Sequence, residues 1–313
     1  MRAVFLGTPA VAVPALSALA ERAEVVGVVC QPDRPAGRGL RMHACAVKEF
    51  ALAHELDLYQ PARVRSGELR DWLELRRPEF ALVMAYGRIL PRDVLAAPRL
   101  GCLNLHASLL PKYRGAAPIQ WALIRGEATT GISLMQMDEG LDTGPVFAER
   151  PLPIAEDETA GSLERKLAAL AADVVRGDLE SALDGRLLPK PQDERIATHA
   201  PPLTAEHAPL DFSSSAIALE RWVRALSPEP GAKTWARGKL LKIHRASVAP
   251  SRGLSQGEVA VEKPDRIWVG TGDGTLRILE AQLEGKKTLS ARELVNGRCL
   301  QDGWHLPNRN VQS

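Results

Sequence analysis

Two polar residues, Asn104 and His106, stand in an apolar run, and Asp142 follows in an acidic loop bracketed by glycines. On an extended chain, residues two apart share a face, so the amide and the imidazole lie side by side while Leu105 points the opposite way. An amide, an imidazole and a carboxylate at strand ends can polarise a carbonyl group and move a proton. These residue types and their spacing predict chemistry on a carbonyl carbon.

Each of these features also has an ordinary structural explanation. An Asn-x-His pair often satisfies its hydrogen bonds at a strand end, and an aspartate in a glycine-rich loop is often a turn residue. The strings around them are longer and more specific: Ser108-Leu-Leu-Pro-Lys-Tyr-Arg-Gly115 and Leu141-Asp-Thr-Gly144. Because ordered strings of this length rarely arise by chance, we interpret the three polar residues as one functional set.

Short apolar runs must position this set. Residues 3–6, 25–29 and 80–85 are apolar, and stretches with helical spacing separate them. This alternation predicts an α/β fold of Rossmann-like type, in which helices cover a mainly parallel sheet. Loops that leave the carboxyl ends of parallel strands line the ligand crevice, so the loops after Ala85 and His106 are expected to border one cleft. Neither Gly-x-Gly-x-x-Gly nor a P-loop is present, which argues against a nucleotide cofactor.

The other elements of the first domain follow from the same periodicities. The expected helices cover 47–56, 69–75, 119–124 and 159–176, and the further strands cover 103–105, 132–137 and 145–150. We expect this domain to span residues 1–188.

A change of texture marks the second domain. Residues 186–209 contain five prolines and few apolar residues, so we place an extended linker at 189–209. Beyond it, a helical stripe is followed by short alternating runs, by the hairpin signal Asp273-Gly274 and by the capping box Ser290-Ala-Arg-Glu293. This pattern predicts a small, OB-like β-barrel over residues 210–313.

Composition limits the class of protein. The chain has 313 residues, 45% of them hydrophobic and 25% charged, which is ordinary for a globular protein of two domains. Its four cysteines form no Cys-x-x-Cys pair and its seven histidines no ligand motif, so neither a disulfide framework nor a metal site is expected. No stretch reaches the roughly 20 apolar residues of a membrane span. A reducing, cytoplasmic setting is expected.

Two basic segments point to a polyanionic partner. Arg34, Arg38 and Arg41 belong to a loop, 31–48, rich in proline and glycine, where guanidinium groups can hold phosphate in a forked geometry. Disorder is the alternative for this loop. Within 221–252, eight basic residues accompany a single acidic one, which indicates a patch for nucleic acid. An ordinary solvated surface is the alternative there.

The two strings around the polar set resemble the active-site signature of the folate-dependent formyltransferases. The resemblance runs through 104–127 (NLHASLLPKYRGAAPIQWALIRGE) and 138–144 (DEGLDTG). The chain as a whole is similar to the branch of this family that formylates methionyl-tRNA. Further matches are 5–9 (FLGTP), 31–39 (QPDRPAGRG), 85–91 (AYGRILP) and 224–234 (RALSPEPGAKT).

This resemblance implies an activity and its site. The activity is transfer of the formyl group of 10-formyltetrahydrofolate to the α-amine of methionine on initiator methionyl-tRNA, for translation initiation and without a metal. Asn104, His106 and Asp142 would be catalytic. The residues expected at the folate co-substrate are Tyr86, Gly87, Leu90, Ser108, Leu109, Leu110 and Pro111. The residues expected at the tRNA are Arg34, Arg38, Arg41, Arg224, Lys233, Lys239 and Lys242.

Two alternatives stay open from the sequence. An amino-sugar formyltransferase, which takes a nucleotide-sugar, would share the central signature but would not need the basic segments. A non-catalytic RNA-binding protein on the same scaffold would not need the polar set. The chain departs from the family at 200–205, which lacks the usual lysines, and at Val11, where an aromatic residue is common. We expect a cytoplasmic monomer that does not associate with membranes.

Overall fold

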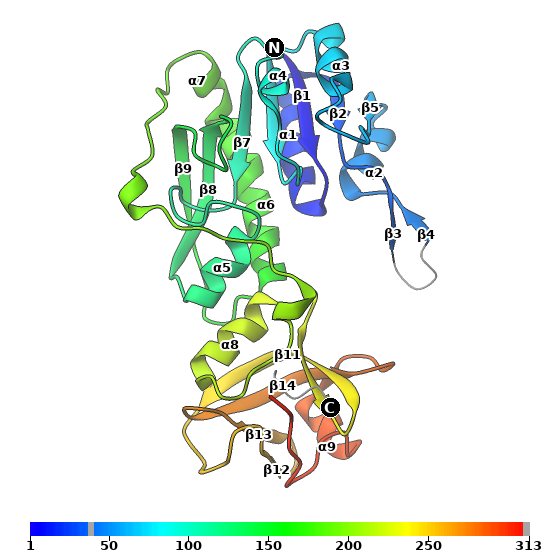
Figure 1. Cartoon of the computed structure of the whole chain (residues 1–313), viewed down its shortest axis with the longest axis vertical. Helices are drawn as coiled ribbons and strands as arrows, with labels where there is room; N and C mark the ends of the chain where they lie inside the picture. The colour runs from blue at the N-terminus through cyan, green and yellow to red at the C-terminus, as the bar shows by residue number, and fades with distance from the viewer. Residues whose placement is uncertain (37–40, 309–313) are drawn as a thin grey trace. The chain divides into compact units, whose positions relative to one another are not determined.

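The structure, a computed structural model, describes residues 1–36 and 41–308. The chain forms two compact units, which are treated separately here (Figure 1). The first comprises Met1–Pro118, Thr129–Pro153 and Glu164–Pro201, and the second comprises Ile119–Ala128, Ile154–Leu163 and the chain from Pro202 onward. The linker predicted at 189–209 is thus divided at Pro201, because most of it pairs with the first unit.

A seven-stranded sheet organises the first unit, in the order β5-β2-β1-β6-β7-β8-β9. The first five strands of this order are parallel, and β8 and β9 run antiparallel at one edge. Helices cover the central strands on both faces, which is why the sequence shows continuous apolar runs there. The predicted Rossmann-like, mainly parallel sheet is confirmed. The strands are β1 (Arg2–Gly7), β2 (Glu24–Val29), β5 (Leu58–Tyr59), β6 (Phe80–Met84), β7 (Cys102–His106), β8 (Thr129–Gln136) and β9 (Val146–Pro153).

The strand order turns back at β1, and this turn locates the ligand crevice. From β1 the chain moves outward to β2 and β5, then returns to β6 and β7 on the other side of β1. Right-handed crossovers of opposite direction lie on opposite faces, and α1 accordingly contacts α2 while α3 contacts α4. Open α/β sheets bind ligands at the carboxyl ends of strands beside such a turn. The helices are α1 (Val13–Arg22), α2 (Ala46–Ala53), α3 (Glu68–Arg76), α4 (Arg92–Leu95), α6 (Ala160–Gly177) and α7 (Leu179–Leu183).

The basic loop predicted at 31–48 contains two short strands. Strands β3 (Arg34–Ala36) and β4 (Arg41–His43) pair antiparallel, and this ribbon projects from the sheet (Figure 1). Arg34 donates to the side-chain oxygen of Gln31 at 2.6 Å. Arg38 lies outside the described residues.

The second unit is built on an antiparallel sheet in the order β10-β11-β14-β13-β12, with β15 paired to β14. Helix α8 packs on β11 and β14, and α9 on β13 and β14. The half-buried Trp121 meets Trp222 edge to face at 6.2 Å, which joins α5 to α8. The elements are α5 (Pro118–Arg125), α8 (Ala216–Ala225), β10 (Ala232–Ala236), β11 (Lys239–Ala249), β12 (Val259–Glu262), β13 (Arg266–Gly270), β14 (Thr275–Leu283), β15 (Leu289–Ser290) and α9 (Ala291–Asn296).

Two local predictions for this unit are confirmed. Asp273-Gly274 lies in the turn that joins β13 to β14, where Gly274 has φ 85°. Ser290 and Glu293 form the capping box that opens α9, each side chain accepting a hydrogen bond from the backbone of the other residue. Local sequence therefore sets these two boundaries.

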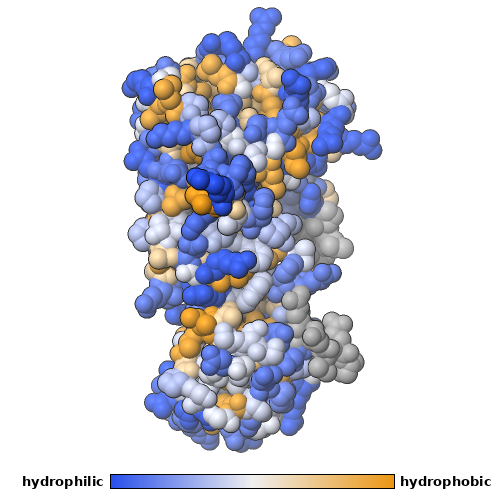
Figure 2. Space-filling model, turned by 60° about the vertical axis from the view of Figure 1, so that its left-hand side comes forward, coloured by the Kyte–Doolittle hydropathy of each residue, from blue (hydrophilic) through white to orange (hydrophobic). Residues whose placement is uncertain are grey.

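The surface and the helices add two observations. The face in Figure 2 is mainly hydrophilic, with hydrophobic residues in scattered groups. None of the helices within 1–36 and 41–308 combines the length and apolar character that a membrane crossing requires.

Candidate active site

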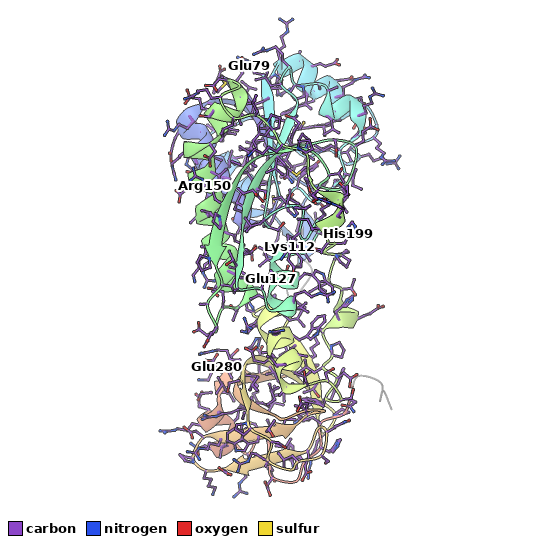
Figure 3. All side chains as sticks on the ribbon, turned by 90° about the vertical axis from the view of Figure 1, so that its left-hand side faces the viewer. Glu79, Lys112, Glu127, Arg150, His199 and Glu280 are labelled. Atoms are coloured by element: carbon purple, nitrogen blue, oxygen red, sulfur yellow. The ribbon has the colours of Figure 1, made fainter. Side chains whose placement is uncertain are left out.

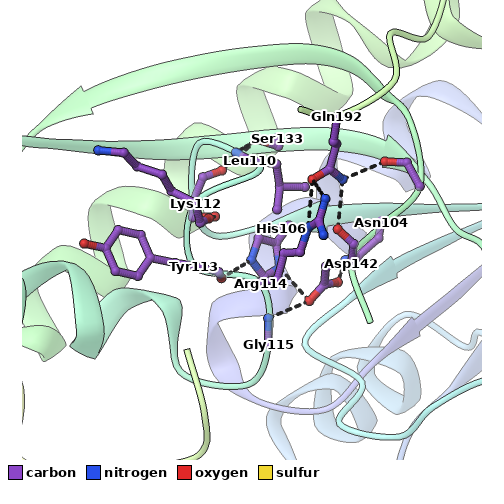
Figure 4. A network of polar contacts seen from close by, with 12 residues as sticks. Asn104, His106, Leu110, Lys112, Tyr113, Arg114, Gly115, Ser133, Asp142 and Gln192 are labelled. Carbon is purple, nitrogen blue, oxygen red and sulfur yellow. Dashed lines mark hydrogen bonds and ion pairs between the residues drawn. The ribbon is translucent and has the colours of Figure 1, made fainter. Parts of the chain in front are cut away.

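Asn104, His106 and Asp142 converge at the carboxyl end of β7, as predicted (Figure 4). The Nδ2 atom of Asn104 lies 3.3 Å from Oδ1 of Asp142, and Nδ1 of His106 lies 3.6 Å from Oδ2 of the same carboxylate. Asn104 and His106 are 8% and 6% exposed, so water competes little for their polar atoms. The carboxylate thus faces both the amide and the imidazole.

The imidazole of His106 is held through Nε2 and faces Asp142 with Nδ1. Its Nε2 lies 2.8 Å from the carbonyl oxygen of Tyr113. Because a carbonyl oxygen only accepts hydrogen bonds, Nε2 carries a proton. A second proton at Nδ1 would face Asp142 and turn that contact into an ion pair. Because the Nε2 proton is already hydrogen-bonded to Tyr113, a substrate would meet the ring at its Nδ1 edge.

The loop that carries Asp142 is held in an uncommon backbone conformation. Asp142 has φ 54°, in the left-handed region, where an aspartate is tolerated better than most residues. Its Oδ2 accepts a hydrogen bond from the backbone N–H of Gly115 at 2.9 Å. Gly115 has φ 120°, and a Cβ there would lie 2.8 Å from the carbonyl oxygen of Ala200. Glycine is therefore required at the position that binds the carboxylate.

The segment Ser108 to Pro111 borders the cluster, but its polar groups are used internally. The Ser108 hydroxyl is fully buried and donates to the carbonyl oxygen of Lys112 at 2.6 Å. The Ser133 hydroxyl donates to the carbonyl oxygen of Ser108 at 2.7 Å and accepts from the N–H of Leu110 at 3.0 Å. Leu110 is buried, whereas Leu109 and Pro111 are half-buried. The Ser108 hydroxyl is therefore engaged within the protein, and the contact of this segment with the folate stays a prediction, for which its apolar side chains are the candidates.

Two other residues predicted at the folate point elsewhere. The side chains of Tyr86 and Leu90 are 2% and 3% exposed and belong to the apolar core with Val4 and Leu6. Only backbone atoms of this loop can meet a ligand at these positions. Gly87 has φ 76°, and a Cβ there would lie 2.6 Å from the amide nitrogen of Gln31. The string 85–91 matches the family, but the match does not indicate which of its side chains face the core.

Replacing Tyr86 with phenylalanine is expected to leave donor binding unchanged and to stabilise the fold. Its buried hydroxyl has no hydrogen-bond partner among the described residues, and such a group costs about 1–3 kcal/mol. Burial raises the pKa of Tyr86 to about 12. Below the ordinary pKa of about 10, the phenol is neutral in the folded and the unfolded protein. As the pH rises from 10 to 12, the phenol ionises more readily in the unfolded chain, so the folded state loses stability. Thermal melting should show a higher midpoint for Tyr86→Phe and a weaker alkaline decline.

The matched measurement for Tyr86→Phe is the KM for the formyl donor. A KM equal to that of the unsubstituted enzyme is expected because the hydroxyl points into the core. A rise of about tenfold would mean that the hydroxyl meets the donor, and would restore the role predicted from the sequence.

An open hollow of about 500 Å³ lies beside the loop of Asp142. Its walls come from α4 and from the segment after β8, neither of which was expected from the sequence to border the site. Asp138 in this wall binds the N–H of Gly140 at 3.0 Å and the hydroxyl of Thr143 at 2.7 Å, which shapes the loop. The lining residues are Arg92, Leu95, Ala96, Met137, Asp138, Glu139 and Gly140.

The basic patch predicted at 221–252 is partly neutralised. Lys242 lies 3.6 Å from Glu229, and Arg245 lies 3.1 Å from Glu280, which Figure 3 labels on β14. Glu280 lies on a neighbouring strand and outside residues 221–252, so a count along that segment does not include it. Among the predicted tRNA contacts of the second unit, Lys239 is exposed and Lys233 half-buried.

Arg224 is a structural residue of the second unit. Its guanidinium binds Glu220 at 2.5 Å and the carbonyl oxygen of Glu158 at 3.2 Å. The Arg224 and Glu220 side chains are 13% and 14% exposed, so this pair is largely shielded from solvent. The contact of Arg224 with tRNA stays a prediction, and the structure shows the guanidinium engaged within the second unit. The side chain is used to join α8 to the segment before α6.

Known proteins are similar to this chain over most of its length. Residues 1–176 match the formyl transferase family, and residues 202–299 match the formyl transferase C-terminal domain. A methionyl-tRNA formyltransferase of Sorangium cellulosum is 53% identical over 309 residues, which are 98% of this chain and 99% of that protein. The chain belongs to the methionyl-tRNA formyltransferase family.

Solved structures show the same fold at low identity. A methionyl-tRNA formyltransferase from Clostridium thermocellum superposes with TM-score 0.54 at 20% identity, over 80% of this chain and 94% of that one. HypX from Aquifex aeolicus in complex with tetrahydrofolic acid superposes with TM-score 0.63 at 20% identity. That alignment covers 96% of this chain and 48% of the HypX chain, so this formyltransferase spans about half the length of HypX.

Proposed function

We infer that this formyltransferase moves the formyl group of 10-formyltetrahydrofolate to the α-amine of methionine on initiator methionyl-tRNA. The reaction supplies formylated initiator tRNA for translation initiation. One observation carries the inference: an intact Asn104, His106 and Asp142 cluster in a chain 53% identical, over nearly its whole length, to a methionyl-tRNA formyltransferase. The enzyme is proposed to work as a cytoplasmic monomer.

The cluster supplies what attack on a formyl carbon requires. The amine adds to the carbon, and the carbonyl oxygen becomes an oxyanion. The Nδ2 group of Asn104 and the Nδ1 proton of His106 would donate to this oxygen, while Asp142 balances the charge of the imidazolium. The C–N10 bond of the folate then breaks. The amine loses one proton and N10 of the folate gains one. We propose that Asp142 carries this proton from the amine to N10.

The donor and acceptor would approach from different elements. The hollow beside α4 and the loop 138–144 offers space for the folate, next to the Asp142 loop. The ribbon of β3 and β4 carries Arg34 and Arg41, and Lys239 adds an exposed cation in the second unit. Phosphate binds such cations without reading sequence.

A comparison of acceptors tests the function. Labelled formyl transfer would be measured with methionyl-tRNA, uncharged tRNA and an amino nucleotide-sugar. Only methionyl-tRNA should become labelled, because uncharged tRNA lacks the amine. Label on the nucleotide-sugar would instead identify an amino-sugar formyltransferase. Binding of tRNA without any transfer would identify a non-catalytic RNA-binding protein.

Lys239→Gln and Arg224→Gln are expected to fail in different ways. Lys239→Gln should raise the KM for methionyl-tRNA, lower the salt dependence of binding by about one unit of slope, and leave melting unchanged. Arg224→Gln leaves Glu220 without its partner and should destabilise the second unit by about 1–3 kcal/mol. Melting curves and salt titrations of tRNA binding check both. Unchanged salt dependence in Lys239→Gln would remove that residue from the interface.

A further inference from the structure

A strap of chain, residues 190–200, runs across the catalytic cluster. At one end, the backbones of Lys190 and Val146 exchange hydrogen bonds of 2.8 and 2.9 Å. At the other, the backbone N–H of Arg114 donates to Thr198 at 2.9 Å, and that of Ala200 donates to Arg114 at 2.7 Å. Figure 3 labels one residue in each of two segments: Lys112, in the loop just before Arg114, and His199, in the strap. The strap is thus attached to both loops that form the site.

Gln192 projects from this strap onto the loop of Asp142. Its Nε2 donates to the carbonyl oxygens of Asp142 at 2.8 Å and of Gly144 at 2.7 Å. Its Oε1 accepts from Nε of Arg114 at 3.0 Å and from NH2 of Arg114 at 2.8 Å. Both N–H donors and both lone pairs of the amide are therefore used, so its orientation is fixed.

Arg114 completes the support from below the strap (Figure 4). Its side chain is 3% exposed, and its second edge binds Glu194 at 2.7 and 2.8 Å. The hydrogen bond with Arg114 lowers the pKa of Glu194. A forked pair at each edge leaves the guanidinium a single orientation.

Three consecutive residues therefore hold the parts of the site. Tyr113 accepts from His106 through its carbonyl oxygen, while its ring points away from the cluster (Figure 4). Arg114 holds Gln192, and the N–H of Gly115 binds the carboxylate of Asp142. A shift of this tripeptide would displace the imidazole and the carboxylate together.

We propose that Gln192 and Arg114 are positioning residues that keep Asp142 in its catalytic orientation. The clamp acts on the backbone carbonyls of Asp142 and Gly144, at and just after the left-handed turn at Asp142. Neither side chain lies among the residues that meet the reacting atoms. The proposal rests on the function inferred above, because it concerns the same reaction.

Loss of the clamp should lower turnover without weakening substrate binding. Residues that orient catalytic groups typically contribute about 10- to 100-fold in activity. Displacements of about 1 Å at a reacting centre have effects of this size. We expect Gln192→Ala to lower kcat by about 10- to 100-fold. The KM for donor and for methionyl-tRNA should stay within about threefold of the starting values.

The test combines that variant with Asp142→Asn. If Gln192 acts through Asp142, adding Gln192→Ala to Asp142→Asn should lower kcat by less than about threefold further. Arg195→Ala is the matched control on the strap, since its side chain is 88% exposed and pairs with Asp193. Arg114→Lys keeps the charge but loses the fork, and should reproduce the kcat loss of Gln192→Ala.

The outcomes separate this proposal from the function itself. Failure of the unsubstituted enzyme to formylate methionyl-tRNA would refute the function. A normal unsubstituted enzyme together with full kcat in Gln192→Ala would refute only the positioning role. So would kcat losses that multiply in the double variant, or a loss that matches the unfolded fraction seen by melting. If Gln192→Ala does not fold, Arg114→Lys and its combination with Asp142→Asn decide in the same way.

Discussion

Asp142→Asn is expected to lower kcat by about 10²–10⁴-fold, the range for a group that assists proton transfer. The carboxylate accepts from Gly115 and Asn104 with different oxygens and faces Nδ1 of His106. An asparagine in its place must direct an NH2 group at one of these donors. It also removes the negative charge that balances the imidazolium. Single-turnover formyl transfer, with enzyme in excess over methionyl-tRNA, measures the loss.

The control for Asp142→Asn is Asp71→Asn. This substitution makes the same chemical change in an exposed ion pair with Arg70, so the variant should retain full activity. The KM of Asp142→Asn for both substrates should change little, because the carboxylate is proposed to act in the transition state, in proton transfer and in balancing the imidazolium, and not in binding the ground state. Retention of more than about a tenth of kcat would exclude Asp142 from the chemical step.

Asn104→Ala is expected to lower kcat by about 10²–10³-fold, the usual effect of losing one oxyanion donor. The amide lies at the end of a buried strand, so its position is set by the sheet and not by the ligand. Among the described residues that contact Asp142, Gln192 is the other side-chain amide. Both of its N–H groups already donate to backbone carbonyls, so it cannot replace Asn104 as a donor to the oxyanion. Steady-state kinetics with methionyl-tRNA measure the effect.

Asn296→Ala provides the matched control for Asn104→Ala. Asn296 ends α9 in the second unit and is exposed, so the same substitution there should not alter turnover. If Asn104→Ala raised the donor KM while kcat stayed constant, the amide would bind the ground state and the transition state equally. The oxyanion role would then be withdrawn.

Local patterns were sufficient to predict the sheet and the catalytic cluster. Buried parallel strands appear as continuous apolar runs, and period-two spacing placed Asn104 and His106 on one face. The carboxylate of Asp142 was joined to them by the resemblance to the formyltransferase signature, because β8, which precedes its loop, runs antiparallel to β7. The turn at Asp273-Gly274 and the capping box at Ser290 were also readable, since each depends on a few adjacent residues.

Long-range pairing explains what the sequence did not reveal. Residues 190–200 look like a proline-rich linker, yet their backbone pairs with loops distant in sequence, and Gln192 carries no local signal. Arg245 looked unpaired along the chain because its partner, Glu280, reaches it from a neighbouring strand. Tyr86 lies in a motif typical of the donor site, but burial of its ring is set by the packing of β1 and β6.

An isotope-edited infrared spectrum of the bound donor would test the central claim most directly. With a ¹³C-labelled formyl group on 10-formyltetrahydrofolate, the carbonyl stretch reports hydrogen bonding to its oxygen. We expect a lower frequency in the unsubstituted enzyme than in Asn104→Ala or His106→Ala, because both side chains would polarise this carbonyl. A frequency identical in all three proteins, with the donor bound in each, would contradict the assignment of the cluster to the formyl carbon.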